Sequence, residues 1–121
     1  MVSYSTRAAW PHLKAAGGSM VYISGIGGRT PGAQFTIGGS VNAALLSFTK
    51  AMAEAGLRDG VQVNCISPGG ILNQQPASFI EKYRSCCNDK GMLDADDLVG
   101  TALYLLSEES RYVTGQNIII D

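Results

Sequence analysis

Apolar residues recur at helical spacing most clearly in the middle of the chain. Over Ser40–Ala55, the residues Val41, Leu45 and Phe48 follow one another at intervals of three or four and form an apolar stripe. Small residues occupy a neighbouring face, which would let another helix approach closely. This pattern predicts a helix over Ser40–Ala55 that ends at Gly56.

Two further helices are predicted from the same spacing and from residues typical of helix ends. Ser5–Ala16 is followed by the pair Gly17-Gly18, which ends a helix well. Ala95–Leu106 is preceded by Asp94, a favourable N-cap residue. Residues 71–92 are expected to be irregular or to contain a short helix around Ala77–Arg84.

Short apolar runs bounded by glycine or proline predict strands over Met20–Ser24, Val61–Ser67 and Asn117–Asp121. The glycine-rich segment Gly25–Gly39 is predicted to be a loop. Strands that alternate with helices indicate right-handed crossovers and a parallel sheet. The sequence therefore predicts a single α/β domain over residues 1–121, with about three parallel strands and three main helices in three layers.

Composition and charge narrow the classes of partner. The chain has 121 residues, of which 45% are hydrophobic and 16% charged. Its nine basic and ten acidic residues give a formal net charge of -1. Because no basic cluster is present, we expect no nucleic-acid partner and no binding to a membrane. Cys65, Cys86 and Cys87 form no CxxC pair, so neither a disulfide framework nor a metal site is predicted. With no signal-peptide core, the predicted compartment is a reducing cytoplasm.

Other polar positions are better explained by structure than by chemistry. The single histidine, His12, lies in a predicted helix with no acid or nucleophile beside it in sequence. Asp94, Asp96 and Asp97 suit the start of a helix, where the dipole favours negative charge. The run Gly25-Ile26-Gly27-Gly28 follows a strand, but no helix begins there, so a loop is predicted rather than a dinucleotide-binding turn.

Four segments, in this order, resemble the short-chain dehydrogenase/reductase family. They match its strand that ends near the catalytic serine, its active-site helix, its strand with a Pro-Gly turn, and its C-terminal strand. The resemblance runs from about Tyr4 to Asp121 and implies a partial Rossmann-like fold that corresponds to the second half of a family domain. The N-terminal βαβ unit with its Gly-rich dinucleotide turn has no counterpart. The four segments are Gly18–Ser24, Asn42–Ala53, Val61–Gly69, and Tyr112–Gln116 with Ile118–Asp121.

The resemblance also shows where the family's catalytic positions fall. In the family a Tyr hydroxyl transfers the proton, a Lys lowers the Tyr pKa from about 10, and a Ser orients the substrate carbonyl. The Ser, Tyr and Lys positions fall on Gly25, Gly38 and Asn42. Glycine has no side chain for proton transfer, and asparagine supplies no cation. No catalytic residue is therefore intact, and the other tyrosines considered lie outside the matching position: Tyr4, Tyr22, Tyr83 and Tyr104.

A second segment of the family contacts the cofactor. Pro68, Gly69, Gly70 and Ile71 resemble the turn whose backbone meets the nicotinamide carboxamide, and Asn73 stands where the family often has Thr. The resemblance implies that these five residues contact NAD or NADP. The alternative is an ordinary strand-ending turn, and the missing phosphate-binding half argues against cofactor binding by this chain alone.

Two functions remain open. The chain is either part of an NAD(P)-dependent oxidoreductase of alcohols or carbonyls that is inactive as a 121-residue chain, or a non-catalytic degenerate half-domain that acts through protein association. The family dimerises through the helices that match residues 5–16 and 40–55. The strand at residues 20–24 would lie at a bare sheet edge. We therefore expect self-association or a complementing chain at these surfaces.

Overall fold

The protein contains a parallel three-stranded sheet, seen in a computed structural model that describes residues 1–87 and 90–121. The strands are β1 (Ser19–Ile23), β2 (Gln62–Pro68) and β3 (Asn117–Ile120), and their order in the sheet is β1-β2-β3. Both strand pairs are parallel, which confirms the predicted α/β sheet. The pair 88–89, within the segment expected to be irregular, lies outside the described residues.

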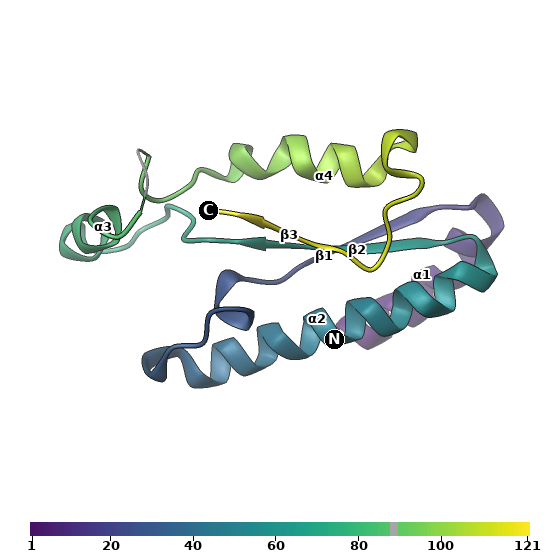
Figure 1. Cartoon of the computed structure of the whole chain (residues 1–121), viewed down its shortest axis with the longest axis horizontal. Coiled ribbons are helices and arrows are strands. Elements are labelled where there is room, and N and C mark those ends of the chain that lie inside the picture. Colours follow the sequence, from purple (N-terminus) through teal and green to yellow (C-terminus); the bar gives the residue numbers. More distant parts are fainter. Residues whose placement is uncertain (88–89) are drawn as a thin grey trace.

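Helices cover both faces of the sheet and give the molecule three layers (Figure 1). α1 (Val2–Ala16) and α2 (Thr36–Asp59) lie on one face, and α4 (Val99–Leu106) lies on the other. The short α3 (Ala77–Arg84) lies beyond the carboxyl ends of the strands. The partial Rossmann-like fold is confirmed, with α3 as a fourth helix at the predicted residues.

The core forms around β2, the central strand. Val63 and Cys65 are fully buried and pack with Tyr22 of β1 and Ala53 of α2. Ile66 alternates to the other side of the strand and is also fully buried, because α4 covers that face. A strand covered on both faces is expected to be almost continuously buried, as β2 is.

α2 begins earlier than its apolar stripe predicts. It starts at Thr36, so Gly38 and Gly39 lie inside the helix and not in the preceding loop. Gly39 is buried, and a Cβ there would stand 3.0 Å from the carbonyl oxygen of Gly27. Gly39 therefore lets the loop after β1 pack directly against the helix backbone.

The other end of α2 also differs from the prediction. Gly56 lies inside the helix, and the helix ends at Gly60, whose φ of +70° suits glycine. A Cβ on Gly56 would collide with the carbonyl oxygen of Val61, because the chain turns back sharply toward β2. Gly56 is thus explained by close backbone approach.

Short 3₁₀ turns account for two further differences. The loop after β1 contains turns at Ile26–Gly28 and Ala33–Phe35. The predicted helix Ala95–Leu106 is divided into a 3₁₀ turn at Ala95–Leu98 and α4. These turns position the glycine-rich loop and the start of α4 near the carboxyl edge of the sheet.

Candidate functional site

The carboxyl ends of the three strands meet at one edge of the sheet. β1 leads into Ser24 and Gly25, β2 ends at Pro68, and β3 leads into Asp121. In open parallel α/β sheets, ligands bind in the crevice outside this edge. The glycine-rich loop, the first turns of α2, and α3 surround this carboxyl edge, which makes the edge the candidate site.

The structure brings the family's Ser and Lys positions together. A Cβ on Gly25 would lie 2.7 Å from the side-chain nitrogen Nδ2 of Asn42. The hydroxyl of Ser24 is directed elsewhere, since its Oγ donates to the backbone oxygen of Asn42 at 3.1 Å. The Asn42 amide therefore occupies the space that a side chain at position 25 would require.

The family's Tyr position is open space. Gly38 lies on α2 four residues before Asn42, so the two positions share a helix face. A Cβ on Gly38 would meet no atom within 4 Å. The site therefore has space for a β-carbon at position 38, but glycine supplies no phenol there.

Tyr22 does not replace the missing phenol. Its hydroxyl forms a hydrogen bond of 2.7 Å with Thr6 Oγ1 in the buried core. Burial is the main cause that raises the Tyr22 pKa, and the hydrogen bond with Thr6 opposes it. This hydroxyl ties β1 to α1 and is already engaged by Thr6.

The turn after β2 presents an open backbone donor. The Leu93 N–H donates to the carbonyl oxygen of Gly70 at 2.8 Å. That carbonyl and the Ile71 N–H belong to one trans peptide and point in opposite directions, so the Ile71 N–H points away from Leu93. Over residues 1–87 and 90–121, no acceptor is recorded for the Ile71 N–H.

The rest of the turn is fixed by neighbouring chain segments. The Gly69 N–H donates to the carbonyl oxygen of Ile120 at 2.7 Å. Gln75 Nε2 donates to the carbonyl oxygen of Ile71 at 2.9 Å, and the Asn73 N–H donates to Gln75 Oε1 at 2.6 Å. Asn73 itself is exposed, so its side chain is free to meet a ligand. The cofactor roles of these residues remain predictions.

Tyr83 is a member of this site that the sequence did not indicate. The Gly70 N–H donates to Tyr83 Oη at 2.5 Å, and the Tyr83 hydroxyl donates to Asp121 Oδ1 at 3.2 Å. Burial is the main cause that raises the Tyr83 pKa; the Gly70 N–H opposes this shift and the Asp121 carboxylate adds to it. No local sequence pattern predicts the contact between Tyr83 and Gly70, because the contact forms only when α3 packs against the turn.

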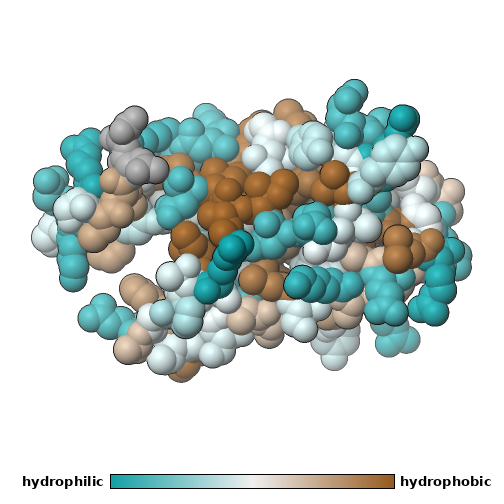
Figure 2. All heavy atoms as spheres, in the orientation of Figure 1, coloured by the Kyte–Doolittle hydropathy of each residue, from teal (hydrophilic) through white to brown (hydrophobic). Residues whose placement is uncertain are grey.

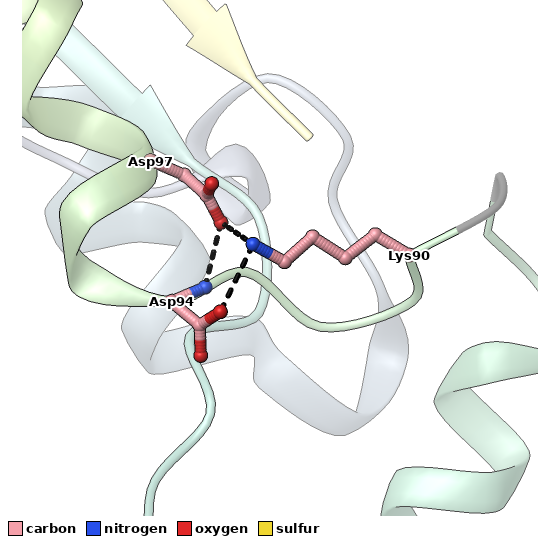
Figure 3. Close-up of polar contacts among 3 residues, drawn as sticks. All are labelled: Lys90, Asp94 and Asp97. Atoms are coloured by element: carbon pink, nitrogen blue, oxygen red, sulfur yellow. Dashed lines mark hydrogen bonds and ion pairs between the residues drawn. The ribbon is translucent and has the colours of Figure 1, made fainter.

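The acidic residues before α4 have a structural role. Lys90 Nζ lies 2.9 Å from Asp94 Oδ2 and 2.5 Å from Asp97 Oδ2, and the Asp94 N–H donates to Asp97 Oδ2 at 2.8 Å (Figure 3). The hydrogen bond from Lys90 is the main cause that lowers the Asp97 pKa. The three side chains fasten the loop after α3 to the start of the 3₁₀ turn that leads into α4.

Other candidate chemistry is sparse in the described part of the chain. No group of three His, Cys, Asp or Glu side chains there is close enough to hold a metal ion. His12 is exposed on α1. Within the same residues, no helix has the length and apolar character needed to cross a bilayer.

Comparison with known sequences identifies relatives. The family model described as "Enoyl-(Acyl carrier protein) reductase" matches residues 2–121. Tropinone reductase-like 3 of Erythroxylum coca is 33% identical over 122 residues, which cover 93% of this chain and 45% of the relative. Post-translational flagellin modification protein A of Campylobacter coli is 54% identical over 61 residues, which cover 50% of this chain and 24% of that protein. Apart from that shorter match, the chain spans about half the length of the curated relatives it matches.

Solved structures share the fold. A short-chain dehydrogenase from Leptospira borgpetersenii with bound NAD⁺ has a TM-score of 0.86 and 32% identity, covering 96% of this chain and 48% of that one. A short-chain type dehydrogenase/reductase from Mycobacterium ulcerans has a TM-score of 0.88 and 28% identity, covering 98% and 46%. Since the family model extends over residues 2–121 and the fold agrees, the chain belongs to the short-chain dehydrogenase/reductase family of oxidoreductases.

Proposed function

We propose that this chain carries the nicotinamide-facing part of an NAD- or NADP-dependent oxidoreductase of alcohols or carbonyl compounds, and that alone it performs no turnover. The observation that carries the proposal is the turn after β2, where the Ile71 N–H is an open donor at the carboxyl edge of the sheet. Gly25, Gly38 and Asn42 lie near this edge and supply no group for proton transfer.

The chemistry of the site supports both halves of the proposal. A nicotinamide carboxamide offers a carbonyl oxygen to a backbone N–H, and the Asn42 amide can hydrogen-bond a ribose hydroxyl. Reduction of a carbonyl also needs a proton donor, and a positioned acid contributes about 10²–10⁴-fold to the rate. The relative from Leptospira holds NAD⁺, as does a 3-oxoacyl-[acyl-carrier protein] reductase from Brucella melitensis.

Nuclear magnetic resonance can test cofactor binding at residue level. Addition of NADH or NADPH to the labelled chain is expected to shift the amide signals of Ile71 and Asn73. Adenosine monophosphate lacks the nicotinamide and serves as the control ligand, which should leave both signals in place. If neither dinucleotide shifts the Ile71 amide, the proposed cofactor contact is wrong.

Turnover is tested separately, by following NADH and NADPH absorbance with a panel of aldehydes and ketones. We expect no oxidation above the rate without protein, because no phenol or ammonium group stands at the family's positions. Protein-dependent oxidation that scales with chain concentration would contradict the proposed inactivity.

A second candidate function is association without catalysis. Val41 on α2 is 64% exposed, and Ile23 at the free edge of β1 is 55% exposed. Between α1 and α2 an apolar groove of about 390 Å³ is lined by Trp10, Phe48 and Met52, among others. A second copy of the chain, or a complementing chain that adds a strand beside β1, would cover these surfaces. Sedimentation velocity distinguishes a monomer from such an assembly.

A further inference from the structure

Tyr83 joins α3 to the turn that the family resemblance assigns to the cofactor. We propose that Tyr83 is a positioning residue: its hydroxyl holds the Gly70 amide and thereby fixes the direction in which the Ile71 N–H is presented. This inference rests on the function proposed above in one respect, namely that the acceptor for the Ile71 N–H is the nicotinamide carboxamide. The arrangement of the turn itself is independent of it.

Two successive peptide groups of the turn are held from different sides. Tyr83 Oη accepts from the Gly70 N–H at 2.5 Å, and the Leu93 N–H donates to the Gly70 carbonyl at 2.8 Å. The Ile71 N–H belongs to the second of these peptide groups. Glycine has the widest backbone freedom of any residue, so Gly70 needs both contacts to keep one conformation. Loss of the Tyr83 contact would let the first peptide group rotate.

The neighbouring residues allow and direct this contact. A Cβ on Gly70 would lie 2.7 Å from Tyr83 Cζ, and a Cβ on Gly69 would collide with Asp121 Oδ1. Only glycine at both positions lets the phenol approach the backbone this closely. The Tyr83 O–H donates to Asp121 Oδ1 at 3.2 Å, which turns the lone pairs of Oη toward the Gly70 N–H. By accepting the hydrogen bond from the Tyr83 hydroxyl, Asp121 leaves the Tyr83 oxygen to accept the hydrogen bond from the Gly70 N–H.

The decisive variant is Tyr83→Phe, which keeps the ring and removes the acceptor. Hydrogen exchange of the Gly70 amide should become about tenfold faster, as expected when one hydrogen bond is lost. Exchange at Val63 and Cys65, in the buried centre of β2, reports the stability of the sheet and should change much less. Tyr112→Phe is the matched control, because Tyr112 is exposed beyond η4, the 3₁₀ turn Glu108–Ser110, at the opposite end of the sheet.

Binding provides the second readout. In wild type and in Tyr112→Phe, NADH should shift the Ile71 amide with the same Kd, whereas in Tyr83→Phe the Kd should rise several-fold. If NADH shifts no Ile71 signal even in wild type, the proposed function fails, and the exchange rates alone decide whether Tyr83 holds the turn. An unchanged Kd with faster Gly70 exchange would reduce Tyr83 to a purely structural contact and overturn the inference.

An unchanged Gly70 exchange rate in folded Tyr83→Phe would also overturn it. Should that variant fail to fold, Asp121→Ala removes only the carboxylate that orients the hydroxyl. It should accelerate Gly70 exchange by a smaller factor than tenfold, and equal exchange in Asp121→Ala and wild type would then reject the inference.

Discussion

Two glycines near the candidate site differ in what surrounds them, and this difference predicts opposite effects of the same substitution. A Cβ on Gly28 would lie 2.7 Å from the backbone carbon of Asn42 and 2.8 Å from the nitrogen of Ala43. A Cβ on Gly38 would meet nothing within 4 Å. The first position faces rigid helix backbone, whereas the second faces open space within a helix.

Gly28→Ala should therefore lower the free energy of unfolding by about 1–3 kcal/mol, as overpacking does. Gly38→Ala should raise it by about 0.5–1 kcal/mol, because alanine loses less backbone entropy in a helix. Urea denaturation of both variants beside wild type measures the two values. If Gly28→Ala does not destabilise the protein, the loop after β1 does not pack on α2 as described; if Gly38→Ala destabilises it, the space beside Gly38 is not open.

At the residue scale, contacts between residues distant in sequence are the hardest feature to predict. The family resemblance placed Gly25 and Asn42 at one site, and the structure brings them together. That the Asn42 amide fills the space beside Gly25 could not be read from either residue alone. Tyr83 lies far from the matching Tyr position in sequence, and its contact with Gly70 depends on how α3 packs.

At the scale of elements, ion pairs attach the loop after α3 to the 3₁₀ turn that leads into α4. Lys90 pairs with Asp94 and Asp97, and the hydrogen bond from Lys90 lowers the Asp97 pKa. A lowered folded-state pKa means that the ion pair is complete above the usual Asp range, near 3.9, and is lost as the pH falls through the lower folded value. These side chains are solvent-exposed, so the pair orders the loop more than it stabilises the fold.

Lys90→Gln should raise the Asp97 pKa toward about 3.9, since the main cause of its depression is removed. Carbon-13 NMR titration of the Asp97 carboxyl measures this directly. Lys82→Gln changes a lysine on α3 outside the cluster and should leave the Asp97 pKa as in wild type. If Lys90→Gln leaves it low, the helix start and not Lys90 sets the shift.

Element boundaries show where sequence patterns stop being sufficient. A short helix around Ala77–Arg84 was one of two expectations for residues 71–92, and the structure has α3 at these residues. α2 was predicted too short at both ends, because Gly38, Gly39 and Gly56 resemble helix breakers. Two of these glycines permit close backbone contacts with Gly27 and Val61, and such contacts are invisible to a local pattern.

For the whole molecule, the exposed apolar surface predicts association. Figure 2 shows apolar atoms gathered along β3 and the adjacent side of α4, and the groove between α1 and α2 adds a second such surface. Val41→Asp places a charge beside that groove without touching the core, so it should shift an oligomer toward monomer in sedimentation velocity. Leu57→Asp, at a residue 73% exposed near the other end of α2, is the matched control. A chain that is monomeric in all three forms would reject association through this groove.

The parallel sheet was predicted correctly at this scale, because strands that alternate with helices are joined by crossovers. The family resemblance added that β1 lies at an edge, as it does in the order β1-β2-β3. That order also governs how the chain reaches its folded state. Ser19 pairs with Gln62, and Cys65 pairs with Asn117, so partners lie roughly forty to fifty residues apart along the chain. Neither of these two strand pairs is a local hairpin, and each must close a long loop before it gains a ladder of hydrogen bonds. During synthesis β3 emerges roughly fifty residues after β2, so β2 has one unprotected edge until β3 follows it, and the newly made chain is most exposed to misassembly in that interval.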